Sequence, residues 1–239
     1  DAAGYQDLSV FMAGLLNVEA AGRRFLYRTG ASFARVRAGI APAPLLGRDQ
    51  LLPQHRGRAR GLVVVGSFVP RSTAQLERVL RANPELGIEL RSSDLFRDQR
   101  ERTIDNVVRK ICATFERGRT PIIYTSRDVT VGRGATESLA IMRQISEAVV
   151  AVVRQAATRC AFDFIISKGG ITSHDVALKA LGARRARVLG PVAAGVPVWR
   201  LGSQSLLPGK PYVVFPEDTL LQVMETLIGR SCQADSTNC

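Results

Sequence analysis

The residues with the clearest chemical potential lie in one short segment, Phe164–Asp175. Its apolar start is typical of a buried strand, and Lys168-Gly169-Gly170 then precedes a run that is typical of a helix. At such a junction, unpaired backbone N–H groups and the helix dipole attract an anion. The two glycines would let a ligand approach the backbone, and Lys168 would add a mobile positive charge. The segment therefore predicts a phosphate site.

A purely structural explanation also fits part of this segment. Thr172 could cap the helix, and Asp175 three residues later could complete a capping box. The segment matches neither a Walker A loop nor a dinucleotide fingerprint. A cap would explain Thr172 and Asp175, but it would not require two adjacent glycines behind Lys168. We therefore favour the anion site.

Two further polar turns follow apolar strands, and each is a weaker signal. Gly66-Ser67 ends the first of these strands, and Ser67 offers a hydroxyl and an N–H to a phosphate or a ribose. Thr125 begins the other turn, in which Arg127 lies among hydroxyl groups; a surface turn with Asp128 is an equally good interpretation. Because the carboxyl ends of parallel strands meet at one edge, all three turns would face one pocket.

The elements that must position these turns alternate along the chain. The predicted helices cover 7–21, 31–38, 72–83, 93–117, 136–159, 173–181 and 219–228. The predicted strands cover 25–28, 62–65, 87–90, 121–125, 162–167, 186–189, 196–201 and 212–215. This order predicts an α/β fold, with a mostly parallel or mixed sheet and helices on both faces.

The pattern also predicts how the chain divides. A Pro- and Gly-rich stretch interrupts any period before Gly61. We expect an N-terminal remnant over 1–46, a linker over 47–60, a nucleotide-binding domain over 61–230 and a disordered tail over 231–239. The start, Asp1-Ala2-Ala3-Gly4, lacks the features of a signal peptide, and we expect the chain to be a piece of a longer protein.

Composition restricts the class of protein. The 239 residues are 46% hydrophobic and 23% charged, which is ordinary for a protein with a buried core, and no apolar run is long enough to cross a membrane. The net charge is +12, but the basic residues are interspersed with acidic ones, and only four of the 33 are lysine. We therefore favour solvated arginine faces over a nucleic-acid site, and we expect a cytoplasmic protein without a membrane partner.

Other catalytic chemistries have little support. The four cysteines lack the spacing of a zinc site, and we expect Cys112 and Cys160 to be small buried hydrophobic residues in a reducing compartment. His55 and His174 are isolated from any nucleophile pattern. The GxSxG and HExxH motifs are both absent from the sequence.

Taken together, the motifs resemble the four-carbon acid sugar kinase family, in its C-terminal nucleotide-binding domain. The similar phrases run in family order: Val64–Pro70, Thr73–Leu76, Tyr124–Arg127, Ser138-Leu139, Ile145-Ser146, Ser167–Asp175, Ala180–Gly182 and Gly195–Trp199. The wording Lys-Gly-Gly-Ile-Thr-Ser resembles a branch that is fused to aldolase-like domains. Phe25–Phe33 resembles the end of the family's N-terminal, acid-sugar-binding domain.

The resemblance implies ATP-dependent phosphorylation of a hydroxyl on a tetronate-type acid sugar, with magnesium. It implies that ATP would contact Ser67, Lys168, Gly169, Gly170, Ile171 and Thr172. Many members carry an acidic residue where Ile171 stands, so Asp175 would direct the metal instead. The resemblance also assigns Arg28 and Ser32 to substrate binding, and the rest of the substrate site to an N-terminal domain. It does not assign the general base.

One departure from the family supports an alternative. The family has a glycine turn after its last long strand, where this chain has Glu217-Asp218. Carboxylates beside a triphosphate would repel it. The alternative is therefore a catalytically degenerate domain with an assembly or regulatory role in a larger fused protein. Its partners would be the missing N-terminal domain or fused enzyme domains, and a homo-oligomer is also compatible with the sequence.

Overall fold

The computed structural model describes residues 2–41, 43–55, 57–66, 69–96, 99–127, 134–215 and 220–228. The chain divides into two compact units, Asp1–Pro44 and Leu45–Cys239, and each is treated by itself. Four features named in the sequence analysis lie outside the described residues: Ser67, Asp128, the Glu217-Asp218 turn and the tail 231–239.

The first unit consists of two helices, α1 (Tyr5–Ala20) and α2 (Ala31–Arg37), which confirms the two helices predicted there. The strand predicted over 25–28 is wrong, because these residues are irregular and pair with no strand in the described chain. The aromatic residues of this segment make ring contacts instead. The rings of Tyr27 and Phe33 are 5.4 Å apart between centroids.

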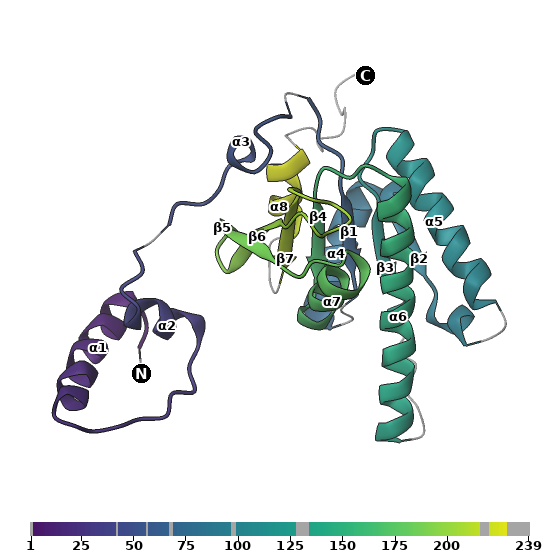
Figure 1. Ribbon diagram of the computed structural model, residues 1–239. Coiled ribbons are helices and arrows are strands. Elements are labelled where there is room, and N and C mark those ends of the chain that lie inside the picture. Colours follow the sequence, from purple (N-terminus) through teal and green to yellow (C-terminus); the bar gives the residue numbers. More distant parts are fainter. Residues whose placement is uncertain are drawn as a thin grey trace. The chain divides into compact units, whose positions relative to one another are not determined.

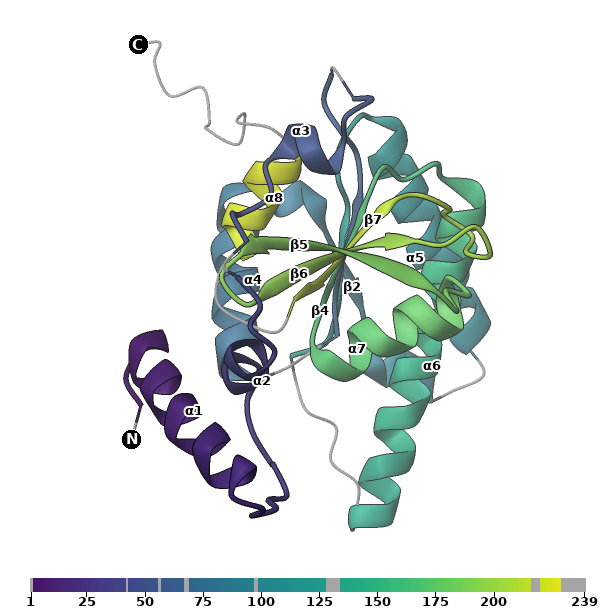
Figure 2. The same cartoon turned by 60° about the vertical axis from the view of Figure 1, so that its left-hand side comes forward.

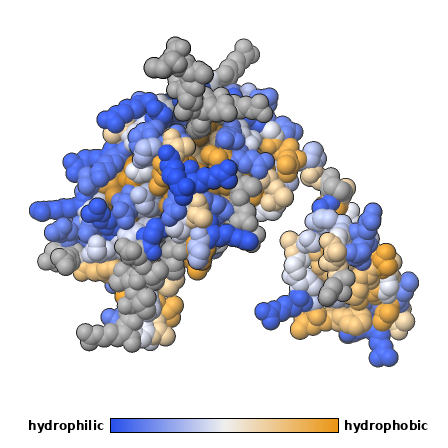
Figure 3. Space-filling model, turned by 180° about the vertical axis from the view of Figure 1, so that it is seen from behind, coloured by the Kyte–Doolittle hydropathy of each residue, from blue (hydrophilic) through white to orange (hydrophobic). Residues whose placement is uncertain are grey.

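Apolar side chains of the first unit are largely exposed. Met12 is the one hydrophobic residue of its described part that is buried, whereas Phe11 on the same helix is 56% exposed. Figure 3 shows apolar surface on the smaller body, which is this unit. Within the first unit, the two helices therefore leave most apolar side chains of α1 uncovered.

The second unit is built on a seven-stranded sheet with the order β2-β3-β1-β4-β7-β6-β5 (Figure 1). The strands are β1 (Leu62–Val65), β2 (Gly87–Leu90), β3 (Ile122–Thr125), β4 (Ile165–Lys168), β5 (Ala186–Ala193), β6 (Val196–Leu201) and β7 (Pro211–Phe215). The first five strands in the order are parallel, and β6 and β5 extend the sheet in antiparallel fashion. The mixed sheet predicted from the sequence is confirmed.

Helices cover both faces of this sheet (Figure 2). One face packs against α5 (Arg100–Glu116), α6 (Ala135–Arg159) and α7 (Gly170–Asp175), which continues as the π-helical turn η3 (Val176–Ala180). The other face packs against α3 (Arg48–Leu51), α4 (Pro70–Ala82) and α8 (Leu220–Ile228). Two short 3-10 turns, η1 (Pro84–Leu86) and η2 (Ser92–Leu95), flank β2. Double cover of this kind explains why the central strands are rich in apolar residues, as in Leu62–Val65.

Part of the segment predicted as a linker is packed into the second unit. Leu51, within this segment, is 2% exposed. Leu46, the last residue of the predicted N-terminal remnant, also belongs to the second unit, where its N–H donates to the Pro191 carbonyl at 2.8 Å. Proline and glycine broke the helical period in this segment and so suggested a free connection. Leu51 and Leu52 lie in the same segment, and both are buried against the sheet.

In the described part of the chain, every helix is too short or too polar to cross a membrane. The longest of them, α6, has 25 residues but carries Arg143, Glu147 and Arg154 along its length. Its apolar residues form one face toward the sheet.

Two cysteines meet where α5 and the end of α6 pack together. The sulfur atoms of Cys112 and Cys160 are 3.0 Å apart, and Cys160 is 5% exposed. Burial, and the hydrogen bond between the two thiols, raise the pKa of Cys160 to about 12. The prediction that these residues act as small buried hydrophobic side chains is consistent with this placement.

We expect Cys160 to be nearly inert toward thiol reagents in the folded protein. At pH 8 a thiol with a pKa of about 12 has roughly a thousandfold less thiolate than an ordinary thiol. Iodoacetamide labelling followed by peptide mass spectrometry measures each cysteine separately, and the same chain unfolded in guanidinium is the control. Labelling of Cys160 at similar rates in the folded and the unfolded chain would contradict the burial and the raised pKa of this thiol.

Candidate functional site

Four parallel strands end at one edge of the sheet and bring the predicted turns together. Val65 of β1 pairs with Lys168 of β4 and with Tyr124 of β3, and Lys168 pairs with Phe215 of β7. The residues that follow these positions therefore lie along one edge. This confirms the expectation that the turns after β1, β3 and β4 share an edge.

The chain leaves β1 and β4 toward opposite faces of the sheet. After β1 it continues into α4 on one face, and after β4 it continues into α7 on the other face. Adjacent parallel strands whose connections diverge leave a crevice between their carboxyl ends, where open α/β sheets bind ligands. The Lys168–Thr172 segment forms one side of this position, and Gly66 lies on the other.

Gly169 sets the turn from β4 into α7. Its φ of 107° is in the region that L side chains rarely adopt, so glycine is required by the backbone. Its N–H donates to the Phe215 carbonyl at 3.0 Å, and its carbonyl accepts the Ser173 N–H at 2.8 Å. Gly169 is the N-cap, and α7 begins at Gly170. The prediction of Thr172 as the cap is wrong, because the glycine turn starts the helix three residues earlier.

Thr172 has a different role, which is to close the gap between α7 and the end of β1. A Cβ added to Gly66 would lie 2.3 Å from Thr172 Oγ1 and 2.8 Å from its Cγ2. The Thr172 side chain therefore occupies the space that a side chain at Gly66 would need. This contact holds the two sides of the crevice together.

Gly170 is not explained by the fold. Its φ is not positive, and a Cβ added there would meet no heavy atom within 4 Å. Neither backbone strain nor packing in the protein alone requires glycine, and the next residue, Ile171, is 72% exposed. What glycine adds here is bare backbone at the start of a helix, which permits close approach of a ligand.

Lys168 does not supply the mobile charge that the sequence suggested. It is 1% exposed, and its ammonium lies 4.5 Å from the centroid of the Phe215 ring. Strand alternation explains the difference, because Lys168 is the last residue of β4 and its side chain lies among the buried residues of the sheet. The Lys168 ammonium is thus held inside the protein by a cation–π contact with Phe215, close to the edge where the parallel strands end.

Asp175 is engaged by its neighbours. Its Oδ2 accepts a hydrogen bond from Ser146 Oγ at 2.7 Å, and its Oδ1 lies 2.9 Å from Lys179 Nζ. Burial would raise the pKa of Asp175, but the hydrogen bonds from Lys179 and Ser146 outweigh burial and hold that pKa below its ordinary value. The carboxylate therefore ties α7 to α6, a role that the sequence did not predict.

A metal site is not assembled from the described residues. None of them form a group of three or more His, Cys, Asp or Glu side chains suited to a metal ion. The contacts of Asp175 do not fit a metal ligand, since both of its oxygens already accept bonds within the protein. The assignment of magnesium to Asp175 stays a prediction without structural support.

The turn after β3 has a structural explanation. The Arg127 guanidinium donates to the Thr125 carbonyl at 2.8 Å from Nη2 and at 3.0 Å from Nε, and it reaches the Val65 carbonyl at 3.4 Å. Burial lowers the pKa of Arg127. Ser126 Oγ accepts the Ser92 N–H at 2.9 Å. These bonds tie the ends of β1, β2 and β3 together, while Asp128 lies outside the described residues.

The residues assigned to substrate binding belong to the first unit. Arg28 is exposed in the irregular segment before α2. Ser32 lies in the first turn of α2, and its hydroxyl is 3.4 Å from the Tyr5 hydroxyl, which is exposed. The two residues remain predictions, as does Ser67, which directly follows Gly66.

Nothing in the sequence indicated the residues of β4 and β7 that form hydrogen bonds to α7. Tyr212 donates its hydroxyl to the Ser173 carbonyl at 2.6 Å, and burial raises the pKa of this phenol. Ser173 Oγ donates to the Ser167 carbonyl at 2.7 Å. The sequence around Tyr212 and Ser173 does not predict their hydrogen bond, because the two residues come together only when β7 lies beside β4.

Comparison with protein families identifies the second unit. Residues 62–216 match a family model described as a nucleotide-binding C-terminal domain. The match covers β1 to β7 and therefore includes the glycine turn and the edge around it. No curated protein sequence matches the chain.

Two solved structures share the fold. Protein HI1011 of Haemophilus influenzae, described as a DUF1537 family member, has a TM-score of 0.57 at 17% identity, over 95% of this chain and 52% of that one. A putative tRNA synthase from Salmonella typhimurium LT2 has a TM-score of 0.52 at 18% identity, over 90% of this chain and 48% of that one. The chain thus spans about half the length of each, and likeness at this identity concerns the fold.

We expect Gly66→Ala to destabilise the second unit by about 1–3 kcal/mol, because the new methyl group overlaps Thr172. Combining it with Thr172→Ala removes the overlapping atoms and should recover more than half of that loss. Chemical denaturation of both single variants and the double variant measures this coupling.

Gly57→Ala is the matched control, because a Cβ at Gly57 meets nothing within 4 Å. A Gly66→Ala variant as stable as the Gly57→Ala variant would refute the contact with Thr172.

Proposed function

Since this chain belongs to the family of nucleotide-binding C-terminal domains, we propose that it is the ATP-binding domain of a kinase acting on a four-carbon acid sugar. The family predicted from the motifs is thereby confirmed for this domain. The aldolase-fused branch, the sugar and the transfer of phosphate are parts of the proposal. The chain spans about half the length of its solved neighbours, so the activity of a whole protein goes beyond what is shown.

The observation that supports nucleotide binding most directly is the unexplained glycine at position 170. Gly169 is required by its φ of 107°, but Gly170 has open space around its Cα and no strained backbone. A phosphate group at the crevice between β1 and β4 would need bare backbone there, and it would meet the N–H groups at the start of α7. Close approach of the phosphate group would then explain why position 170 is a glycine.

Phosphoryl transfer requires mainly positioning and charge neutralisation, and this chain offers both at the edge. Backbone N–H groups of Gly170, Ile171 and Thr172, in the first turn of α7, would orient the phosphates, while the Gly169 N–H stays bonded to the Phe215 carbonyl. Lys168, held over the Phe215 ring inside the protein, would contribute a positive potential at the phosphates and would not contact them directly. Rigid donors of this kind need no rearrangement when charge develops on the transferred group.

Magnesium would enter such a site with the triphosphate. In the described residues Asp175 is committed to Ser146 and Lys179, so the nucleotide and water would supply most of the ligands of the metal. On the sugar side, we propose that Arg28 binds the carboxylate of the acid sugar through its guanidinium, with Ser32 as a hydroxyl partner.

A degenerate, non-catalytic domain is the second candidate. The sequence Glu217-Asp218, which follows β7 after Pro216, has two acidic residues where the resembling family has a glycine turn. The Gly169 N–H donates to the Phe215 carbonyl, and the acidic pair begins two residues after Phe215 in the sequence. Its charge would weaken ATP binding by repulsion.

Substitution of Gly170 separates ligand binding from folding. We expect Gly170→Ala to leave stability unchanged or slightly raised, because the methyl group meets nothing, and to weaken ATP·Mg binding roughly tenfold. Gly170→Asp should abolish measurable binding, because its carboxylate meets the triphosphate, although an acidic residue suits a free helix start. Isothermal titration calorimetry and thermal melting measure the two effects.

Gly57→Asp adds the same charge at a position with open space and is the control. Equal ATP affinities of the wild type and the Gly170→Asp variant, or no binding by the wild type, would sink the nucleotide site at this turn.

Phosphate transfer distinguishes the two candidates. If the kinase proposal is right, the chain mixed with ATP, magnesium and erythronate or threonate yields a phosphate monoester that is detectable by ³¹P NMR and lost in Gly170→Asp. ATP binding without transfer to any tetronate would instead favour the non-catalytic candidate. Transfer that persists in Gly170→Asp would assign the activity to another site.

A further inference from the structure

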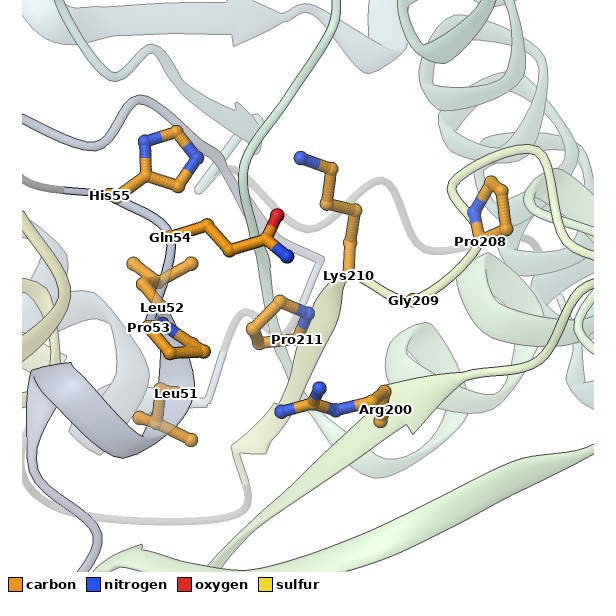
Figure 4. A pocket seen from close by; sticks show the side chains of 10 residues that line it. All are labelled: Leu51, Leu52, Pro53, Gln54, His55, Arg200, Pro208, Gly209, Lys210 and Pro211. Atoms are coloured by element: carbon orange, nitrogen blue, oxygen red, sulfur yellow. The ribbon is translucent and has the colours of Figure 1, made fainter.

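A second pocket of about 400 Å³ lies at the opposite edge of the same unit (Figure 4). Its lining includes Lys210 and Pro211, which stand at the start of β7, and Arg200 of β6, which pairs with Pro211. The glycine turn follows the other ends of the parallel strands. The pocket is therefore separate from the proposed nucleotide site, and its volume falls in the range of small-molecule sites.

Two walls from distant parts of the sequence face each other across this pocket. Figure 4 shows Gln54 and His55, which follow α3, on one side and Lys210 and Arg200 on the other. The ammonium of Lys210 reaches toward Gln54 and His55, and the Arg200 guanidinium reaches toward the segment that begins at Leu51. Lys210 and Arg200 thus border the same pocket and reach toward different parts of the facing wall.

The lining carries positive charge and no carboxylate. Arg200 and Lys210 are cations, and Gln54 contributes an amide that can donate. Arg200 Nε is buried, and in the described part of the chain it has no hydrogen-bond partner. A buried donor without a partner is costly, and because Arg200 lines the pocket, a bound anion would meet its guanidinium through the two Nη groups.

Asp163 lies outside the pocket lining, and its carboxylate pairs with two of the lining residues. Asp163 Oδ1 lies 2.8 Å from His55 Nε2 and 3.6 Å from Lys210 Nζ, and its Oδ2 accepts the Arg60 N–H at 2.9 Å. The Asp163 side chain is 10% exposed, whereas those of His55 and Lys210 are 33% and 36% exposed. Asp163 therefore fixes two donors at the pocket, and its single charge does not cancel both Lys210 and Arg200.

We infer that this pocket binds a small organic anion through Arg200 and Lys210. The guanidinium presents a planar set of donors that suits a carboxylate or a phosphate, and Lys210 adds a second charge. Leucine and proline side chains, among them Leu52 and Pro53, form the remaining wall and suit a short carbon body. A nucleic-acid strand is not the ligand, since the site is a pocket of limited volume rather than an extended basic face.

Binding of succinate and of inorganic phosphate to the full chain tests this site. Calorimetry should show saturable binding of at least one of these probes, and the one that binds identifies the head group. Arg200→Gln and Lys210→Gln should each weaken that binding about tenfold or more. Arg184→Gln removes the same charge from an exposed position and should leave it unchanged.

The Gly170→Asp variant controls for the proposed nucleotide site, and it should retain the anion affinity of the wild type. Thermal melting checks that each variant is folded. The inference is overturned if neither probe binds the wild type, if folded Arg200→Gln and Lys210→Gln variants bind as the wild type does, or if Gly170→Asp alone removes the binding.

Discussion

The parallel pairing of β1 with β4 is the constraint on which the rest of the second unit depends. Both strands are buried on both faces, and their connections diverge, so the crevice at their carboxyl ends follows from the topology. Thr172 of α7 packs beside Gly66 at the end of β1 and occupies the space that a side chain there would need. Tyr212 and Asp175 then hold α7 against the sheet and against α6. The start of α7 is thus placed by contacts made entirely within the protein.

Much of this unit was predictable from the sequence because its strands are short, mainly apolar runs that are separated by helical patterns and polar turns. The strands at Leu62–Val65 and Gly87–Leu90 were predicted with their observed bounds. The strand expected over 25–28 failed because aromatic residues suit a strand only if another strand pairs with them. The start of α7 failed because capping preferences pointed to Thr172, whereas the positive φ of Gly169 had already turned the chain. Side-chain direction was the other weak point, as the burial of Lys168 shows.

The opposite edge of the sheet was not predictable in this way. His55 and Asp163 are more than a hundred residues apart in sequence and are 2.8 Å apart in the structure. Neither residue lies in a motif, and His55 looked isolated. A composition rich in arginine gave no reason to single out Arg200. The two edges therefore differ in kind: one carries a glycine-rich motif that a sequence displays, and the other is a set of donors that only the folded sheet brings together.

The central claim is that the glycine turn after β4 holds the phosphates of a nucleotide. The most direct measurement is a titration of the ¹⁵N-labelled chain with ATP·Mg, followed by the backbone amide resonances. The account predicts that the largest shifts fall on Gly66, Gly169 and Gly170, while Gly209 and Lys210 at the other edge change little. Shifts that are largest at Gly209 and Lys210, or that are absent at the glycine turn under saturation, would contradict it.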